Sequence, residues 1–193
     1  MSLTRLNTII TEAFSPFTLA GILITLIAIT TDPTWGTPVA ISLTFIVALP
    51  LALTLWMART GRTTDHYINI RKQRTPFYAG TLLSLITGAI ALNFVNTSHE
   101  VPLALNLSIA TLIIVTIVNL KLKVSIHALV GALFATVAPL YLPLPHPLGY
   151  TLGIIIWALT VNSRRYLKRH NGLELTTGTI FGLMLAATYL TLR

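Results

Sequence analysis

The sequence contains no cysteine and few charged residues. Without cysteine, the protein cannot form a disulfide, a thiolate-ligated zinc site or a thiol nucleophile. Only 9% of its 193 residues are charged, compared with about 25% in a typical soluble domain. Its five acidic residues form no paired cluster of the kind that holds Mg²⁺. These shortages favour a membrane protein and indicate neither a metal site nor a cofactor.

Long apolar runs take the place of the missing charges. About 20 apolar residues cross the ~30 Å hydrocarbon layer of a membrane, and helices are favoured there because they satisfy their own backbone groups. The candidate spans are residues 14–30, 38–56, 77–94, 102–120, 125–142, 148–161 and 175–192. No Ala-x-Ala cleavage site follows the first run, so we expect it to be retained as a span. We therefore predict an all-α polytopic transmembrane helix bundle of six to seven spans, forming one domain over residues 1–193.

Lysine and arginine are concentrated in three connections between these runs. Residues 59–74, 121–123 and 164–169 carry eleven of the thirteen cations. Seven spans place these basic loops and Arg5 on one membrane face, which the positive-inside rule assigns to the cytoplasm. Phosphate binding is an alternative reason for the position of the cations. Because they alternate with spans, the net charge of +8 does not indicate nucleic-acid binding.

The other three connections carry no Lys or Arg. Asp32 and Glu100 are their charged residues, and we expect both to be solvated loop residues. The protein is predicted to be a multi-pass protein of the cell membrane, with the lipid bilayer as its surroundings and the basic loops facing the cytoplasm.

The third basic loop combines a cation, a histidine and a carboxylate. Arg164 follows Ser163 and can grip phosphate oxygens through charge-assisted hydrogen bonds. His170 and Glu174 are four apart and would share a helix face. The carboxylate would then hold one imidazole nitrogen and leave the other free to attack phosphorus. Alternatively, Asn171 and Glu174 form a capping box, and the cations only anchor the chain at the membrane surface.

The other basic loops supply further candidates for a phosphate site. Lys123 leads into Ser125 and His127. The cation and the hydroxyl can bind phosphate oxygens, and the imidazole can protonate a leaving group. Alternatively, His127 is only a polar residue at the entrance of a helix. Arg71 and Arg74 of the first loop are additional cations for the phosphate.

These stretches resemble the three signatures of the type 2 phosphatidic acid phosphatase superfamily. The last signature reads Ser-Arg, five residues, His, three residues, Asp, and the second reads Pro-Ser-Gly-His. The residues that match in identity and spacing are Ser163, Arg164 and His170 in the last signature, and Ser125 and His127 in the second.

Departures from the family pattern also occur. Glu174 replaces the Asp of the last signature, and Val124 and Ile126 replace the Pro and Gly of the second. A glycine there would let the backbone approach a phosphate closely, and isoleucine lacks that freedom. In the first signature Arg74 matches, Pro76 follows one residue late, and the family's Lys is missing. The stretch is similar to short actinobacterial members of the superfamily.

The resemblance implies a metal-independent lipid phosphate phosphatase of the cell envelope. Its substrate would be a lipid phosphate or diphosphate, with a polyprenyl type favoured and phosphatidic acid or phosphatidylglycerol phosphate as possibilities. His170 would form a phosphohistidine, with Glu174 as its partner and His127 as the acid. The residues that would bind the phosphate are Arg71, Arg74, Lys123, Ser125 and Arg164. The alternatives are an inactive descendant that binds or transports an anionic lipid, and a basic-anchored structural membrane protein.

Overall fold

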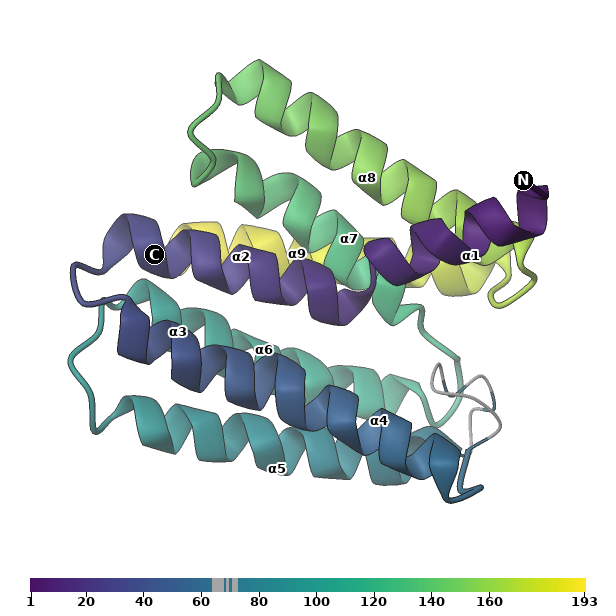
Figure 1. Ribbon diagram of the computed structural model, residues 1–193, viewed down its shortest axis with the longest axis horizontal. Helices are drawn as coiled ribbons and strands as arrows, with labels where there is room; N and C mark the ends of the chain where they lie inside the picture. The colour runs from purple at the N-terminus through teal and green to yellow at the C-terminus, as the bar shows by residue number, and fades with distance from the viewer. Residues whose placement is uncertain (64–67, 69, 71–72) are drawn as a thin grey trace. The chain divides into compact units, whose positions relative to one another are not determined.

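The computed structural model describes residues 1–63, 68, 70 and 73–193, and its regular structure there is helical, without any β-strand (Figure 1). The predicted all-α class is therefore confirmed. The elements are α1 (Leu3–Ala13), α2 (Pro16–Thr31), α3 (Gly36–Ser42), the π-helix η1 (Leu43–Ala48), α4 (Leu49–Arg59), α5 (Arg74–Leu92), α6 (Glu100–Val118), α7 (Ile126–Val137), the 3₁₀-helix η3 (Ala138–Leu140), α8 (His146–Tyr166) and α9 (Gly172–Leu192).

In the part of the chain that the structure describes, five helical stretches are long and apolar enough to cross a membrane. They are Leu3–Thr31, Gly36–Arg59, Arg74–Leu92, Glu100–Val118 and Gly172–Leu192. The apolar helix formed by α7 and η3, Ile126–Leu140, is shorter. α8 has 21 residues, but its C-terminal turns are polar because they contain Asn162, Arg164 and Arg165. These helices indicate a membrane-embedded protein.

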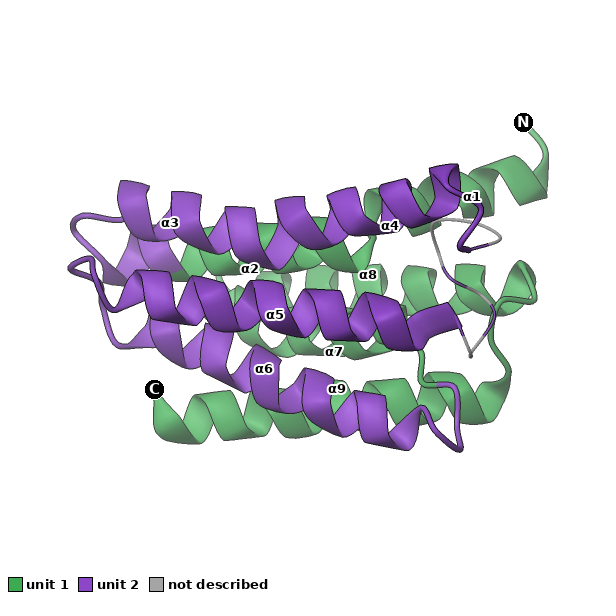
Figure 2. Cartoon of the chain, turned by 90° about the horizontal axis from the view of Figure 1, so that it is seen from below, with its two compact units in different colours: residues 1–27, 124–193 green, residues 28–123 purple. Residues whose placement is uncertain are grey.

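The chain forms two compact units (Figure 2). Unit 1 comprises Met1–Ile27 and Val124–Arg193, and unit 2 comprises Ala28–Lys123. Within unit 1, α7 packs against α8 and α9, and α1 packs against α8. Within unit 2, α5 packs against α6, α4 and η1. Unit 1 therefore holds the stretches that carry Ser125, His127 and His170.

α7 and α9 approach each other closely because glycines of α9 lie at their contact. A Cβ atom at Gly178 would overlap the carbonyl oxygen of Ser125 and lie 3.2 Å from the Cβ of Ala128. One turn later, a Cβ atom at Gly182 would overlap the carbonyl oxygen of Leu129. Small residues of this kind let transmembrane helix backbones come together. The start of α7 is thus held against the first turns of α9.

The π-helix in unit 2 coincides with a proline. In a π-register, each carbonyl accepts from the N–H five residues later, and Pro50 has no N–H to offer the carbonyl of Phe45. The hydroxyl of Ser84, on α5, donates to that carbonyl at 2.7 Å. The side chain of a neighbouring helix thereby satisfies a backbone group that has no water to bind in lipid.

Asp32 is buried, so the expectation of a solvated loop residue is wrong. Its carboxylate accepts from the N–H of Ser98 at 2.9 Å, the N–H of Thr34 at 2.8 Å and the hydroxyl of Thr34 at 2.9 Å. These bonds join the connection after α2 to the connection after α5. Burial opposes the charge and would raise the pKa of Asp32, but the hydrogen bonds outweigh it and hold the pKa below its ordinary value of 3.8.

Acid should weaken this link within unit 2. Because the folded pKa of Asp32 is depressed, its stabilising contribution is present above about pH 4 and is lost as the pH falls through the folded pKa. Asp32→Asn should therefore lower the unfolding temperature near neutral pH, and its difference from wild type should shrink in acid. Thermal unfolding in detergent, followed by circular dichroism between about pH 7 and pH 3, measures this. A difference that stays constant over that range would contradict the assignment.

Candidate functional site

The end of α8 sets the spacing between Arg164 and His170. Lys168 adopts a left-handed conformation with φ 53°. Its N–H donates to the carbonyl of Arg165 at 3.0 Å, and the N–H of Arg169 donates to the carbonyl of Arg164 at 3.1 Å. This is the Schellman arrangement, in which a left-handed residue closes a helix, although glycine is its usual occupant. The last helical turn and this closing turn together account for the five residues between Arg164 and His170.

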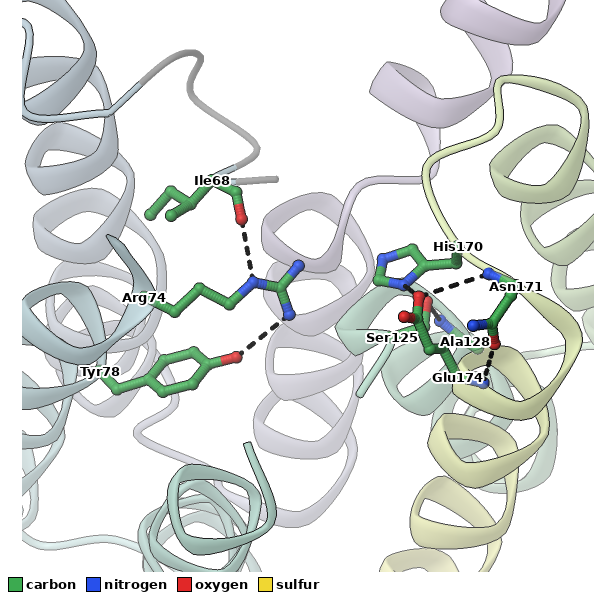
Figure 3. A network of polar contacts seen from close by, with 8 residues as sticks. All are labelled: Ile68, Arg74, Tyr78, Ser125, Ala128, His170, Asn171 and Glu174. Atoms are coloured by element: carbon green, nitrogen blue, oxygen red, sulfur yellow. Dashed lines mark hydrogen bonds and ion pairs between the residues drawn. The ribbon is translucent and has the colours of Figure 1, made fainter. Parts of the chain in front are cut away.

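α9 begins with a capping box that also holds His170. The side chain of Asn171 accepts from the N–H of Glu174 at 2.9 Å, and Oε2 of Glu174 accepts from the N–H of Asn171 at 3.3 Å. The same Oε2 lies 2.8 Å from Nδ1 of His170 (Figure 3). His170 precedes the cap, so the expectation that it shares a helix face with Glu174 is wrong. The two meet because the carboxylate folds back over the start of the helix.

This contact fixes the tautomer of His170. A carboxylate only accepts hydrogen bonds, so Nδ1 carries a proton and donates it to Oε2 of Glu174. The imidazole is 1% exposed, and its surroundings therefore hold the ring in place. A charge-assisted bond to Glu174 also stabilises any positive charge that develops on the ring. His170 can act as a nucleophile or base through Nε2.

The start of α7 lies against Glu174. Ser125 is the N-cap of α7, and its hydroxyl oxygen accepts from the N–H of Ala128 at 3.4 Å. The N–H of Ser125 donates to the backbone carbonyl of Glu174 at 3.2 Å. The structure thus brings Ser125 and Glu174, from two sequence motifs, together. His127 lies buried in the first turn of α7, where the helix dipole favours an anion.

Positive charge predominates in unit 1. Its cations are Arg5, Arg164, Arg165, Lys168, Arg169 and Arg193, and its carboxylates are Glu12 and Glu174. Arg164 is 1% exposed, although arginine is rarely buried so deeply. Ser125, His127 and His170 are buried in the same unit. A buried guanidinium, a capped helix start and an oriented imidazole are together suited to bind and attack an anionic group.

The remaining candidates lie outside unit 1. Arg74 is a buried residue of unit 2 at the start of α5. Its Nε donates to the carbonyl of Ile68 at 2.9 Å, and its Nη1 lies 3.5 Å from the hydroxyl of Tyr78 (Figure 3). Lys123 is the last residue of unit 2, and Arg71 lies outside the described residues. The phosphate-binding roles of these three cations stay predictions.

The sequence interpretation missed two features of the site. The close approach at Gly178 was overlooked, although its signal was present as the pair Gly178 and Gly182, four residues apart in an apolar helix. The left-handed Lys168 gave no signal, because lysine is not the residue that such a turn favours. Within the described part of the chain, no group of three or more His, Cys, Asp or Glu side chains could hold a metal ion.

Comparisons with known proteins identify no relative: no protein-family model, no curated protein and no solved structure matches this chain. A proposal for its function therefore depends on the residues and geometry of the site.

Loss of the Asn171 side chain should loosen the start of α9. Asn171→Ala removes the acceptor for the N–H of Glu174, and loss of such a cap costs about 1 kcal/mol. Asn171→Ser keeps a capping oxygen and should lie close to wild type. The free energy of unfolding in detergent, obtained by titration with denaturant, distinguishes the variants. Equal stability of Asn171→Ala and Asn171→Ser would show that the cap contributes nothing.

Proposed function

We propose that the protein is a membrane-embedded phosphatase of the type 2 phosphatidic acid phosphatase superfamily, which hydrolyses a lipid phosphate or diphosphate through a phosphohistidine. The observation that carries the proposal is the position of Glu174. Its side chain orients His170, and its backbone carbonyl holds the Ser125 turn that leads to His127. A nucleophile and an acid in one unit, with a buried arginine, are the groups that metal-free phosphoryl transfer requires.

In the first step, Nε2 of His170 attacks phosphorus in line with the leaving oxygen. The P–O bond to the lipid breaks as the P–N bond forms, and His127 gives its proton to the departing oxygen. Glu174 balances the positive charge that the phosphorylated ring acquires, because Nδ1 keeps its proton.

In the second step, water cleaves the phosphohistidine. His127, now neutral, takes a proton from the attacking water, the P–N bond breaks, and inorganic phosphate leaves. His127 regains its proton and His170 its lone pair, so the enzyme returns to its starting state.

Fixed positive charge stabilises the transferring group. Arg164, the hydroxyl of Ser125 and the first amides of α7 would bind its equatorial oxygens. The roles of Arg71, Arg74 and Lys123 in phosphate binding are proposed from the family resemblance alone. In phosphoryl transfer, positioning and electrostatic stabilisation provide most of the catalysis. The excess of cations in unit 1 supports this assignment, and the proposed reaction uses no metal and no cofactor.

The substrate presents its phosphate at the membrane surface while its tail stays in the lipid. A polyprenyl phosphate or diphosphate of the cell envelope is the favoured class, and phosphatidic acid and phosphatidylglycerol phosphate are alternatives. We place the protein in the cell membrane with six to seven spans, α7 and α8 adding to the five apolar stretches, and with its basic loops facing the cytoplasm.

A second candidate is a non-catalytic protein that binds or transports an anionic lipid. Val124 and Ile126 stand where the family has Pro and Gly, and Ile126 is the first residue of α7. A buried arginine can hold an anionic headgroup without chemistry.

Replacing the two site histidines distinguishes these candidates. His170→Ala should reduce phosphate release to background, because no nucleophile remains, and His127→Ala should reduce it about 10²–10⁴-fold, as expected for loss of a general acid. His146→Ala is the matched control, because His146 is an exposed histidine of the same unit at the opposite end of α8. Phosphate release is measured with purified protein on a panel of lipid phosphates and diphosphates. A wild type as inert as both site variants would favour the lipid-binding candidate.

Chelation tests the metal-independent mechanism. Because His170 and the cations supply the chemistry, turnover should persist at full rate in millimolar EDTA. The same assay, performed before and after dialysis against the chelator, provides the comparison. Loss of turnover that Mg²⁺ restores would eliminate the proposed histidine mechanism.

A further inference from the structure

The two histidines of the site lie at the starts of different helices, and the contact between these helices has to fix their separation. His127 lies in the first turn of α7, whereas His170 immediately precedes the cap of α9. In-line transfer needs the acid and the nucleophile on opposite sides of one phosphorus atom, and a displacement of about 1 Å can cost on the order of 10²-fold in rate. The residues that set the distance between α7 and α9 therefore affect the reaction.

Ser125 is the point at which α7 is held. Its N–H donates to the carbonyl of Glu174 at 3.2 Å, and its own carbonyl oxygen lies against the Cα of Gly178, where a Cβ atom would overlap it. Residues 174 and 178 are one turn apart on α9. Both backbone polar groups of Ser125 therefore face successive turns of α9, and the space at Gly178 exists only because glycine has no side chain.

We infer that Gly178 is a positioning residue, which sets the distance between the acid His127 and the nucleophile His170. The inference rests on the proposed function. A methyl group at this position would push the Ser125 turn, and His127 with it, away from α9. His170, Asn171 and Glu174 hold one another through contacts that do not involve α7, so the nucleophile would keep its orientation.

This geometry predicts a selective chemical defect. Departure of an alkyl oxygen needs a proton from His127, whereas departure of nitrophenolate does not. The value of kcat/KM includes steps only up to departure of the leaving group. It therefore reports whether His127 can protonate the leaving oxygen, without a contribution from the second step. The second step needs His127 for every substrate, because the proton of the attacking water has to be removed.

Gly178→Ala in the purified full-length protein tests the inference, with Gly172→Ala as the matched control. Gly172 lies on the same helix, and a Cβ atom there has nothing within 4 Å. For Gly178→Ala, kcat/KM on dodecyl phosphate should fall about 10²-fold, with a much smaller fall on 4-nitrophenyl phosphate. A burst of nitrophenolate, equal in amount to the enzyme, should precede slow turnover as phosphohistidine accumulates. Gly172→Ala should match wild type on both substrates.

A general structural defect would have a different signature. It would lower kcat/KM for both esters by the same factor and leave no burst, and this result would overturn the inference. Wild-type rates in Gly178→Ala would overturn it as well. If wild type cleaves neither these esters nor any member of the lipid-phosphate panel, the proposed function fails. That outcome differs from an active wild type whose Gly178→Ala variant shows no selectivity.

A second variant keeps the test decisive if Gly178→Ala does not fold. A Cβ atom at Gly182 would overlap the carbonyl oxygen of Leu129, in the same interface but one turn farther from Ser125. Gly182→Ala should show the same preference for the nitrophenyl ester with a smaller loss on dodecyl phosphate. Equal losses on the two esters would overturn the inference.

Discussion

The arrangement of the site depends on Glu174, because this residue makes three contacts that would otherwise need separate residues. Its side chain caps α9 through the N–H of Asn171 and holds Nδ1 of His170, while its carbonyl receives the N–H of Ser125. Capping and orientation of the imidazole are therefore not competing explanations of the same carboxylate. The helix cap gives the carboxylate its direction, and that direction brings Oε2 to Nδ1 of the ring.

Unit 1 differs from a soluble protein in having many more cations than carboxylates and in burying one of the cations. The unit has six Lys and Arg residues but two Asp and Glu residues, and one of these two carboxylates contacts His170. Arg164 is nevertheless buried. A guanidinium taken out of water creates a positive potential that a multiply charged anion would compensate. The small number of carboxylates in unit 1 therefore contributes to the positive potential of the site.

Local patterns predicted much of this structure, and long-range contacts account for what they did not predict. The apolar runs indicated helices, and Asn171 with Glu174 indicated the cap, because both depend on neighbours in sequence. Asp32 was misjudged because its partner Ser98 lies 66 residues away, and a lone acidic residue in a loop does not reveal such a partner. The role of Gly178 was equally hidden, since it depends on where the carbonyl of Ser125 lies.

The closing turn of α8 determines why five residues separate Arg164 from His170. Five residues are what one helical turn and a left-handed closure at Lys168 use. The segment is therefore a fixed spacer and not a tolerant surface loop, although most of its side chains are exposed to some degree. Its side chains can be exchanged, but an insertion or deletion would change the position of His170 relative to the end of α8. Natural variation here should alter residue identity and preserve length.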